Sequence, residues 1–243
     1  MPVPDRRSVL SLLCGSSILP LAGPVWAQGA VRQLPLTAPD GLRPNLVTVA
    51  ASRFQDRDAV AVALTDPAQA ALRTPNAVGN GPSFAMPDLE FANGTIEVDI
   101  AAQINGRGPP DVRGFIGIAF HIAPDISTFE AVYLRMTNGS RNVPPPPAPR
   151  NAFAVQYISF PDRYWRLLRE QHPNRYEQPA PVAIETWHTL RLHIRGSQLQ
   201  ASVDGATVLT VGDLRFPDRA GRIGLWVDDG TTGYFRDLRV TSA

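Results

Sequence analysis

Apolar and polar residues alternate with a period of two along several short stretches of the chain. The clearest stretches are residues 93–100, 187–194, 198–203 and 234–240. This alternation predicts strands with one face toward a core and the other toward solvent. Residues 115–122 and 129–136 are more continuously apolar, which predicts strands that are covered on both faces or that line a groove.

Turn sequences separate these stretches, because an Asn-Gly or Asp-Gly pair occurs at residues 105–106, 138–139, 204–205 and 229–230. Only residues 66–72 are typical of a helix, with Asp66 placed to cap its start and Pro67 at its first position. The pattern therefore predicts a single all-β domain over residues 28–243. About a dozen antiparallel strands fit a two-sheet jelly-roll sandwich with its core between the sheets.

The first 27 residues have a different character. Arg6 and Arg7 precede an apolar stretch, and the small residues at 25–27 are typical of a cleavage site. This pattern predicts a secretion signal, residues 1–27, in which the arginine pair resembles a twin-arginine leader. We expect a bacterial protein that is periplasmic or secreted and begins near Gln28, with an uncleaved membrane anchor as the alternative.

The composition excludes several classes of chemistry. All 23 basic residues are arginines, so a Schiff-base lysine or a P-loop lysine is absent. The only cysteine, Cys14, lies in the predicted leader, which leaves the mature chain without a thiol nucleophile or a disulfide. The net charge of +1 falls to zero when the leader is removed. Nucleic acid and membrane surfaces are therefore not expected as partners.

Several sequence segments carry a resemblance to a known superfamily. These are FANGTIE at 91–97, GFIGIAF at 114–120, WHTLRL at 187–192, VDG at 203–205, GRIGLW at 221–226 and FRDLRV at 235–240. The succession resembles the concanavalin A-like lectin/glucanase superfamily, nearest to domains of the 3-keto-disaccharide hydrolase type. The resemblance implies a sandwich with one concave sheet, on which many relatives hold sugars.

Residues suited to sugar binding gather between positions 129 and 170. The candidates for substrate binding are Tyr133, Arg135, Asn138, Gln156, Tyr157, Trp165 and Arg169. Aromatic rings stack on the apolar face of a pyranose, while arginine and amide groups bind its hydroxyls. We expect Tyr133 and Arg135 on one strand face and Trp165 and Arg169 on a neighbouring strand, with the proline loop, residues 144–149, as one wall. The alternative is that the aromatic residues fill the core and the arginines pair with surface acids.

Candidate catalytic residues are fewer. His121 follows an apolar run and is expected to share a strand face with Gly117 and Ala119, which leave room for a ligand. We name His121 and Glu130 as candidates for a general base. Glu97 and Asp99 begin the paired-carboxylate pattern of retaining glycosidases, but the second glutamate of the glucanase motif is absent, so a solvent-facing role is the alternative.

The sequence identifies no metal site, because no two histidines have a ligand spacing. The Asp-Asp-Gly sequence at 228–230 is typical of a calcium loop and equally of an ordinary turn. We therefore expect no cofactor, with calcium as the one candidate ion.

Three functions stay open at this point. The first is an exported protein that binds a glycan or glycoside on the concave face. The second is a glycoside hydrolase or lyase acting on oxidised (3-keto) sugars, as the resemblance implies. The third is a structural protein of the cell envelope.

Overall fold

The computed structural model describes Met1 and residues 31–75, 77 and 79–243. The predicted leader, apart from Met1, lies outside the described residues. None of the helices in the described ranges has the length and hydropathy that a membrane span requires.

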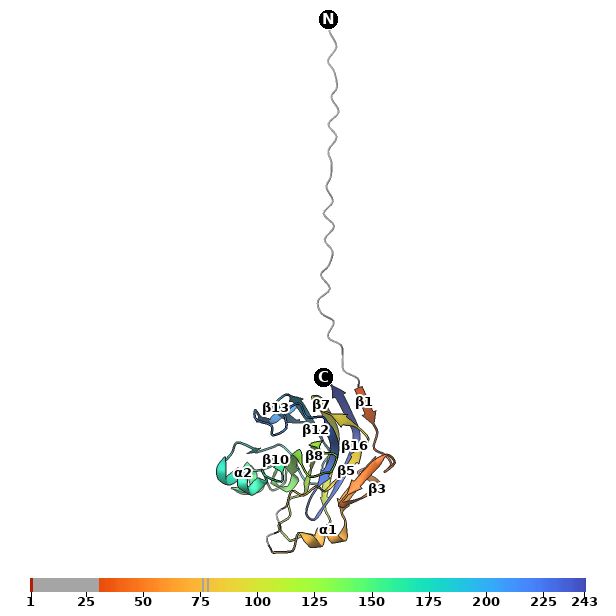
Figure 1. The fold of residues 1–243 in the computed structure, drawn as a ribbon. Coiled ribbons are helices and arrows are strands. Elements are labelled where there is room, and N and C mark those ends of the chain that lie inside the picture. The colour runs from red at the N-terminus through yellow and green to blue at the C-terminus, as the bar shows by residue number, and fades with distance from the viewer. Residues whose placement is uncertain (2–30, 76, 78) are drawn as a thin grey trace.

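Two eight-stranded antiparallel sheets form the body of the molecule (Figure 1). The order in sheet A is β14-β13-β12-β7-β16-β4-β3, with β1 paired to β16. Its strands are β1 (Val31–Leu34), β3 (Val47–Phe54), β4 (Arg57–Leu64), β7 (Gly94–Ile104), β12 (His188–Arg195), β13 (Gln198–Val203), β14 (Ala206–Val211) and β16 (Thr231–Ser242).

Sheet B has the order β11-β10-β9-β8-β15-β5-β2, with β6 paired to β15. Its strands are β2 (Leu42–Asn45), β5 (Phe84–Pro87), β6 (Glu90–Phe91), β8 (Phe115–Ile122), β9 (Phe129–Arg135), β10 (Val155–Phe160), β11 (Glu177–Gln178) and β15 (Gly221–Val227). The two-sheet, all-β jelly roll is therefore confirmed. The sixteen strands in the described part exceed the expected dozen because several edge strands are only two to four residues long.

The core lies between the sheets, as the alternating pattern requires. Ile96 and Val98 on β7 and Ile116 and Ile118 on β8 are fully buried, and each contributes roughly 1.5 to 3 kcal/mol through removal of its side chain from water. The alternate residues of β8 and β9 point to the outer face of sheet B, turned away from sheet A. On β9, the predicted sugar-binding residues Tyr133 and Arg135 lie on this outer face.

The helices are short: α1 (Asp66–Ala71), α2 (Trp165–Gln171) and the 3-10 turns η1 (Met136–Asn138) and η2 (Arg150–Ala152). The expected helix near residue 66 is confirmed, but Thr65 caps it, because its Oγ1 accepts a hydrogen bond from the Ala68 N–H at 3.3 Å. The prediction that Trp165 and Arg169 lie on a strand is wrong, since both are in α2. Residues four apart share a face in a helix as well as in a strand, and the spacing alone does not separate the two.

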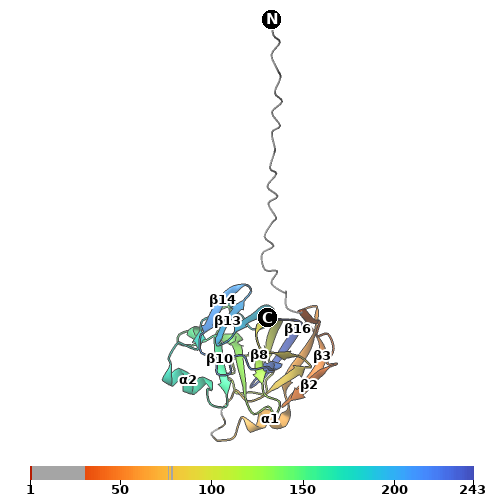
Figure 2. The same ribbon diagram turned by 45° about the horizontal axis from the view of Figure 1, so that its top comes forward.

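The outer face of sheet B is only partly open. Helix α2 lies beside β10 in both views (Figures 1 and 2), and its Leu168 is buried. The segment before β5 covers the sheet at β15, where the Trp226 Nε1–H donates to the Gly81 carbonyl oxygen at 3.0 Å. The space left between these covers is a pocket rather than the open groove expected from the sequence.

Candidate functional site

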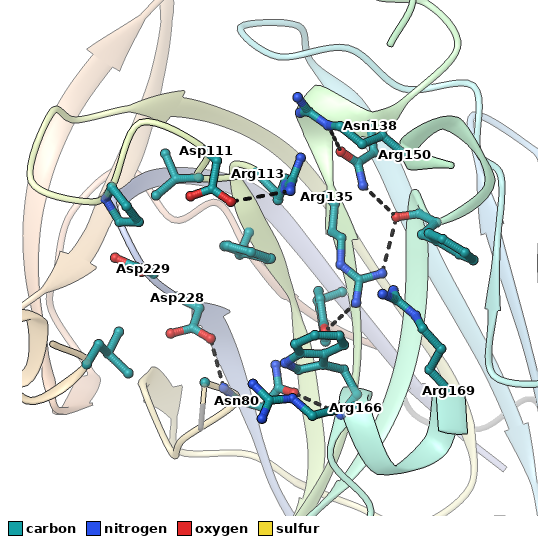
Figure 3. A pocket seen from close by; sticks show the side chains of 18 of the residues that line it. Asn80, Asp111, Arg113, Arg135, Asn138, Arg150, Arg166, Arg169, Asp228 and Asp229 are labelled. Carbon is teal, nitrogen blue, oxygen red and sulfur yellow. Dashed lines mark hydrogen bonds and ion pairs between the residues drawn. The ribbon is translucent and has the colours of Figure 1, made fainter. Parts of the chain in front are cut away.

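A pocket of about 400 Å³ opens on the outer face of sheet B, where β9 runs into η1 (Figure 3). Its walls come from segments that are far apart in the sequence. The lining residues with polar or aromatic side chains are Asn80, Asp111, Arg113, Phe115, Tyr133, Arg135, Asn138, Arg150, Phe153, Trp165, Arg166, Arg169, Asp228 and Asp229. Five of the predicted binding residues thus line one cavity: Tyr133, Arg135, Asn138, Trp165 and Arg169. Their role in binding stays a prediction.

Tyr133 and Arg135 form the floor, because alternate residues of β9 point to the same face. The Tyr133 ring is fully buried and lies 4.7 Å from the Trp226 ring, measured between centroids. Its hydroxyl oxygen accepts a hydrogen bond from Arg135 Nη2 at 3.1 Å. Burial raises the pKa of the Tyr133 hydroxyl, so this group stays protonated at neutral pH. Because Trp226 covers the Tyr133 ring, the ring has no free face on which a ligand could stack.

Hydrogen bonds to three residues fix the Arg135 guanidinium on the side away from the pocket. Gln156 Oε1 accepts from Arg135 Nη2 at 3.0 Å, and the Phe153 carbonyl oxygen and a Glu177 carboxylate oxygen lie 3.2 and 3.4 Å from Nη1. Gln156 is itself fully buried and does not line the pocket. Its placement indicates that it orients Arg135 rather than touching a ligand.

Helix α2 forms one wall through Trp165 and Arg169. The Asn80 side-chain oxygen accepts from the Trp165 backbone N–H at 3.2 Å, which satisfies a free donor at the helix start. The Arg169 guanidinium lies 4.8 Å from the Trp165 ring centroid and 4.1 Å from that of Phe153. It also forms two 2.6 Å hydrogen bonds to Glu177. Cation–π contacts and a forked salt bridge therefore fix this wall.

The opposite rim is built by η1 and η2, around the buried Asn138. Its amide donates to the Phe153 carbonyl oxygen at 3.0 Å, and its oxygen accepts from Arg150 Nε at 3.2 Å. Arg150 Nη2 also donates to Thr137 Oγ1 at 2.9 Å. Of the predicted proline wall, only Pro149 reaches this pocket, while Pro144 to Pro147 line a separate hollow beside it.

Carboxylates occupy the other side of the pocket, across from Arg135 and Arg169 (Figure 3). Asp228 is buried, and its Oδ2 accepts from the Asn80 backbone N–H at 2.8 Å. Burial, with a smaller contribution from the neighbouring Asp229, raises the pKa of Asp228 to about 6. Such a carboxyl group can hold or release a proton near neutral pH.

Asp229 is engaged within the protein, because its Oδ1 accepts from Gln69 Nε2 at 2.6 Å and pairs with Arg73. In the described part of the chain, no group of three or more histidine, cysteine, aspartate or glutamate side chains is placed to hold a metal ion. The calcium expectation at residues 228–230 stays a prediction.

The two candidates for a general base lie elsewhere. His121 and Glu130 are fully buried on the inner side of sheet B, with His121 Nδ1 2.7 Å from Glu130 Oε2. Tyr157 joins them there, since its hydroxyl donates to Glu130 Oε1 at 2.5 Å. None of the three lines the pocket. This closed arrangement favours a structural role.

The expectation that His121 shares a face with Gly117 and Ala119 is wrong, and a β-bulge is the reason. The register between β8 and β15 shifts after Ala119, so that two residues of β8 oppose one of β15. His121 adopts a φ of 51° at this place. The extra residue breaks the alternation and turns the imidazole toward Glu130.

Glu97 and Asp99 lie on β7 in sheet A, away from the pocket. Glu97 pairs with Arg239 at 3.0 Å, and Asp99 accepts from Thr189 Oγ1 at 2.7 Å. Their neighbours Ile96 and Val98 face the core. The solvent-facing alternative for this pair therefore agrees with the structure.

Sequence reasoning missed Asn80, Arg113, Arg150 and the acid–base character of Asp228. Asn80 and Arg113 lie in loops without a motif, and the chain offers no signal for them. Arg150 follows the proline run directly, and its position there was a usable signal. Asp228 belongs to the Asp-Asp-Gly sequence that is typical of a calcium loop and equally of a turn, and this sequence carries no signal for a raised pKa.

Comparisons with known proteins address the fold. No family model matches the chain, and no curated protein sequence matches it. Among solved structures, the carbohydrate binding module CBM66 from Bacillus subtilis is similar, with a TM-score of 0.52 and 14% identity over 83% of this chain and 96% of that one. A Bacillus subtilis protein of unknown function with a galectin-like fold has a TM-score of 0.53 and 13% identity, covering 88% and 97%.

A β-glucanase from Bacillus licheniformis has a TM-score of 0.51 and 12% identity, covering 88% of this chain and 99% of that one. Identities this low show a shared fold and no more. The finer likeness to the 3-keto-disaccharide hydrolase type stays a prediction. The structure thus has the concanavalin A-like jelly-roll fold of the lectins and glucanases, which the sequence segments had indicated.

Proposed function

We propose that the protein binds a saccharide in the pocket on the outer face of sheet B. The observation that carries this proposal is the mixture of groups around one cavity of about 400 Å³. The rings of Phe115, Phe153 and Trp165 offer apolar contact, and Arg135 and Asn138 offer hydrogen bonds. A sugar ring presents the complementary pair, an apolar C–H face and a rim of hydroxyls.

The fold gives independent support. Two of the similar solved structures are described as a carbohydrate binding module and a β-glucanase. The size and partial opening of the pocket fit one or two sugar units at the end of a glycan. Because the contacts are few, we expect a dissociation constant in roughly the micromolar to millimolar range.

A glycan array probed with the purified protein tests the proposal, followed by calorimetric titration with the glycan that binds best. Trp165→Ala should weaken that binding about tenfold or more, since the stacking of a ligand ring on an aromatic side chain is worth roughly 1 to 3 kcal/mol. Trp187→Ala is the matched control, because Trp187 is also half-buried but packs on sheet A against Phe54. An array without any bound glycan, or unchanged binding by a folded Trp165→Ala variant, would contradict the proposal and favour a structural envelope protein.

A second candidate function is glycan cleavage, by hydrolysis or elimination, and Asp228 is the observation that favours it. A buried carboxyl group with a pKa of about 6 that lines a pocket suits general acid or base catalysis. Mass spectrometry of the bound glycans after incubation tests this function. Cleavage products that form with the wild-type protein, with a rate that changes near pH 6, and that disappear with Asp228→Asn would support it.

We also propose that the protein acts outside the cytoplasm after export by the twin-arginine route. Changing Arg6 and Arg7 together to glutamine should leave the unprocessed chain in the cytoplasm. Normal export of this double variant in cell fractionation would refute the proposed leader.

A further inference from the structure

The pocket contains more positive than negative charge. The pocket and its salt-bridge partners contribute six guanidinium groups and four carboxylates: Arg73, Arg113, Arg135, Arg150, Arg166 and Arg169, against Asp111, Asp228, Asp229 and Glu177. The whole chain has a net charge of only +1. The excess is therefore local to the pocket and is not a general property of the surface.

The carboxylates do not neutralise this excess. Glu177 is shared, because its Oε2 lies 2.6 Å from Arg169 Nη2 and 3.4 Å from Arg135 Nη1. Two guanidinium groups thus face a single negative charge. Asp229 forms an ion pair with Arg73, which does not line the pocket.

Arg113 and Arg150 carry uncompensated charge at the rim beside Asn138, and the exposed Arg166 adds more on the wall formed by α2. Arg150 is half-buried, and its hydrogen bonds go to the neutral groups of Thr137 and Asn138. Among the described residues it forms no ion pair. Arg113 has only a 3.5 Å contact with Asp111, whose side chain is 74% exposed. Burial lowers the pKa of Arg113, and the positive charge of Arg150 lowers it further, so the two guanidinium groups repel one another.

An anionic group placed between these two side chains would remove the repulsion and gain charged hydrogen bonds. Figure 3 shows both guanidinium groups on the same edge of the pocket as Asn138. A guanidinium presents its donors as a planar fork, which matches the two oxygens of a carboxylate or a sulfate. A neutral sugar offers only hydroxyls and leaves the repulsion in place.

Building on the proposed function, we propose that the pocket selects acidic saccharides, whose carboxylate or sulfate docks against Arg113 and Arg150. The sugar ring then lies toward Trp165 and Phe153. The shared requirement is an anionic group on a sugar ring, and uronic acids and sulfated sugars both supply it.

The experiment compares matched glycans on the array and by calorimetric titration. Oligoglucuronates are compared with glucose oligomers of the same length, and sulfated galactans with unmodified galactans. The acidic member of at least one pair should bind about tenfold more tightly or better, as expected for a hydrogen bond to a charged group. Raising NaCl from about 0.05 to 0.5 M should weaken that binding, because salt screens partly exposed charges. The pair that responds identifies the carboxylate or the sulfate as the group recognised.

Arg150→Gln and Arg113→Gln test the docking site. Each should reduce binding of the acidic glycan about tenfold, and a thermal unfolding curve checks that each variant is folded at the temperature of the titration. Arg195→Gln is the matched control, because Arg195 is exposed on β12 of sheet A and does not line the pocket. It should bind as the wild type does.

Two results would overturn the inference while the proposed function stands. One is that neutral glycans bind as tightly as their acidic partners in both pairs. The other is that Arg150→Gln and Arg113→Gln retain the preference for the acidic member. An array without any bound glycan would instead overturn the proposed function, and this inference with it.

Discussion

Strand β9 carries a polar cluster on each of its two faces, and the two clusters differ in how completely their charges are paired. On the inner face, the Glu130 carboxylate has the Tyr157 hydroxyl at 2.5 Å, the Arg215 backbone N–H at 2.7 Å and His121 Nδ1 at 2.7 Å. On the outer face, Arg135 belongs to a group in which guanidinium groups outnumber carboxylates. The Glu130 carboxylate is thus fully hydrogen-bonded within the protein, whereas the outer cluster includes guanidinium groups without a carboxylate partner, such as Arg150.

Burial of a polar group does not by itself mark a functional site. Glu130 and Arg135 are both buried, yet only Arg135 borders a cavity. A closed network of buried hydrogen bonds holds a fold together. Guanidinium groups beside a cavity that have no carboxylate partner, such as Arg150, are available to a ligand. Variants of the two clusters should therefore differ in whether they change stability or ligand binding.

Glu130→Ala should lower the free energy of unfolding by about 3 to 5 kcal/mol, because it leaves the partners of a buried carboxylate without an acceptor. Urea denaturation measures the loss. Glu90→Ala, at an exposed glutamate of β6, should cost less than about 0.5 kcal/mol. A Glu130→Ala protein of normal stability that no longer binds its glycan would place Glu130 in the binding site instead.

Asp228 should make stability depend on pH. Its pKa is raised from 3.8 in an ordinary environment to about 6 in the folded protein, so the folded state binds this proton more tightly than the unfolded chain does. The stabilisation is complete below about pH 4 and is lost as the pH rises through about 6.

Asp228→Asn should therefore be more stable than the wild type at pH 8, by up to about 3 kcal/mol, and the difference should vanish near pH 4. Denaturation curves across this range give the measurement. Asp111→Asn, at a largely exposed carboxylate, should show no such trend. An Asp228→Asn effect of equal size at every pH would mean that the raised pKa is not its cause.

Two tyrosine variants give the smallest and most direct comparison of the faces. Tyr157→Phe removes a hydroxyl bonded to the Glu130 carboxylate, and Tyr133→Phe removes one bonded to the Arg135 guanidinium, so each should cost about 1.5 to 3 kcal/mol of stability. Only Tyr133→Phe should also weaken glycan binding by a few-fold, because Arg135 loses one partner. Denaturation and calorimetric titration report both quantities, and the reverse pattern would exchange the roles assigned to the two faces.

Much of the pocket could be anticipated from the sequence. Tyr133 and Arg135 were placed on one strand face by alternation alone, and Asn138 follows them within three residues. Gln156 pairs directly with Tyr133 across the β9–β10 ladder, yet its amide is turned to Arg135 and to backbone oxygens. The sequence identifies the face of β10 on which Gln156 lies, but not the groups with which its amide forms hydrogen bonds.

The strands and the two faces of each follow from the amino-acid sequence alone, because the period-two pattern is local and a half-buried strand requires it. The sequence also determines the position of turns through Asn-Gly and Asp-Gly pairs. Three features depend on tertiary contacts instead: the helical state of residues 165–171, the orientation of His121 at a bulge, and the position of Asn80, Arg113 and Asp228 around one cavity. These outcomes depend on sheet pairing and on loops that pack over the sheet, and such long-range contacts leave no periodic trace in the chain.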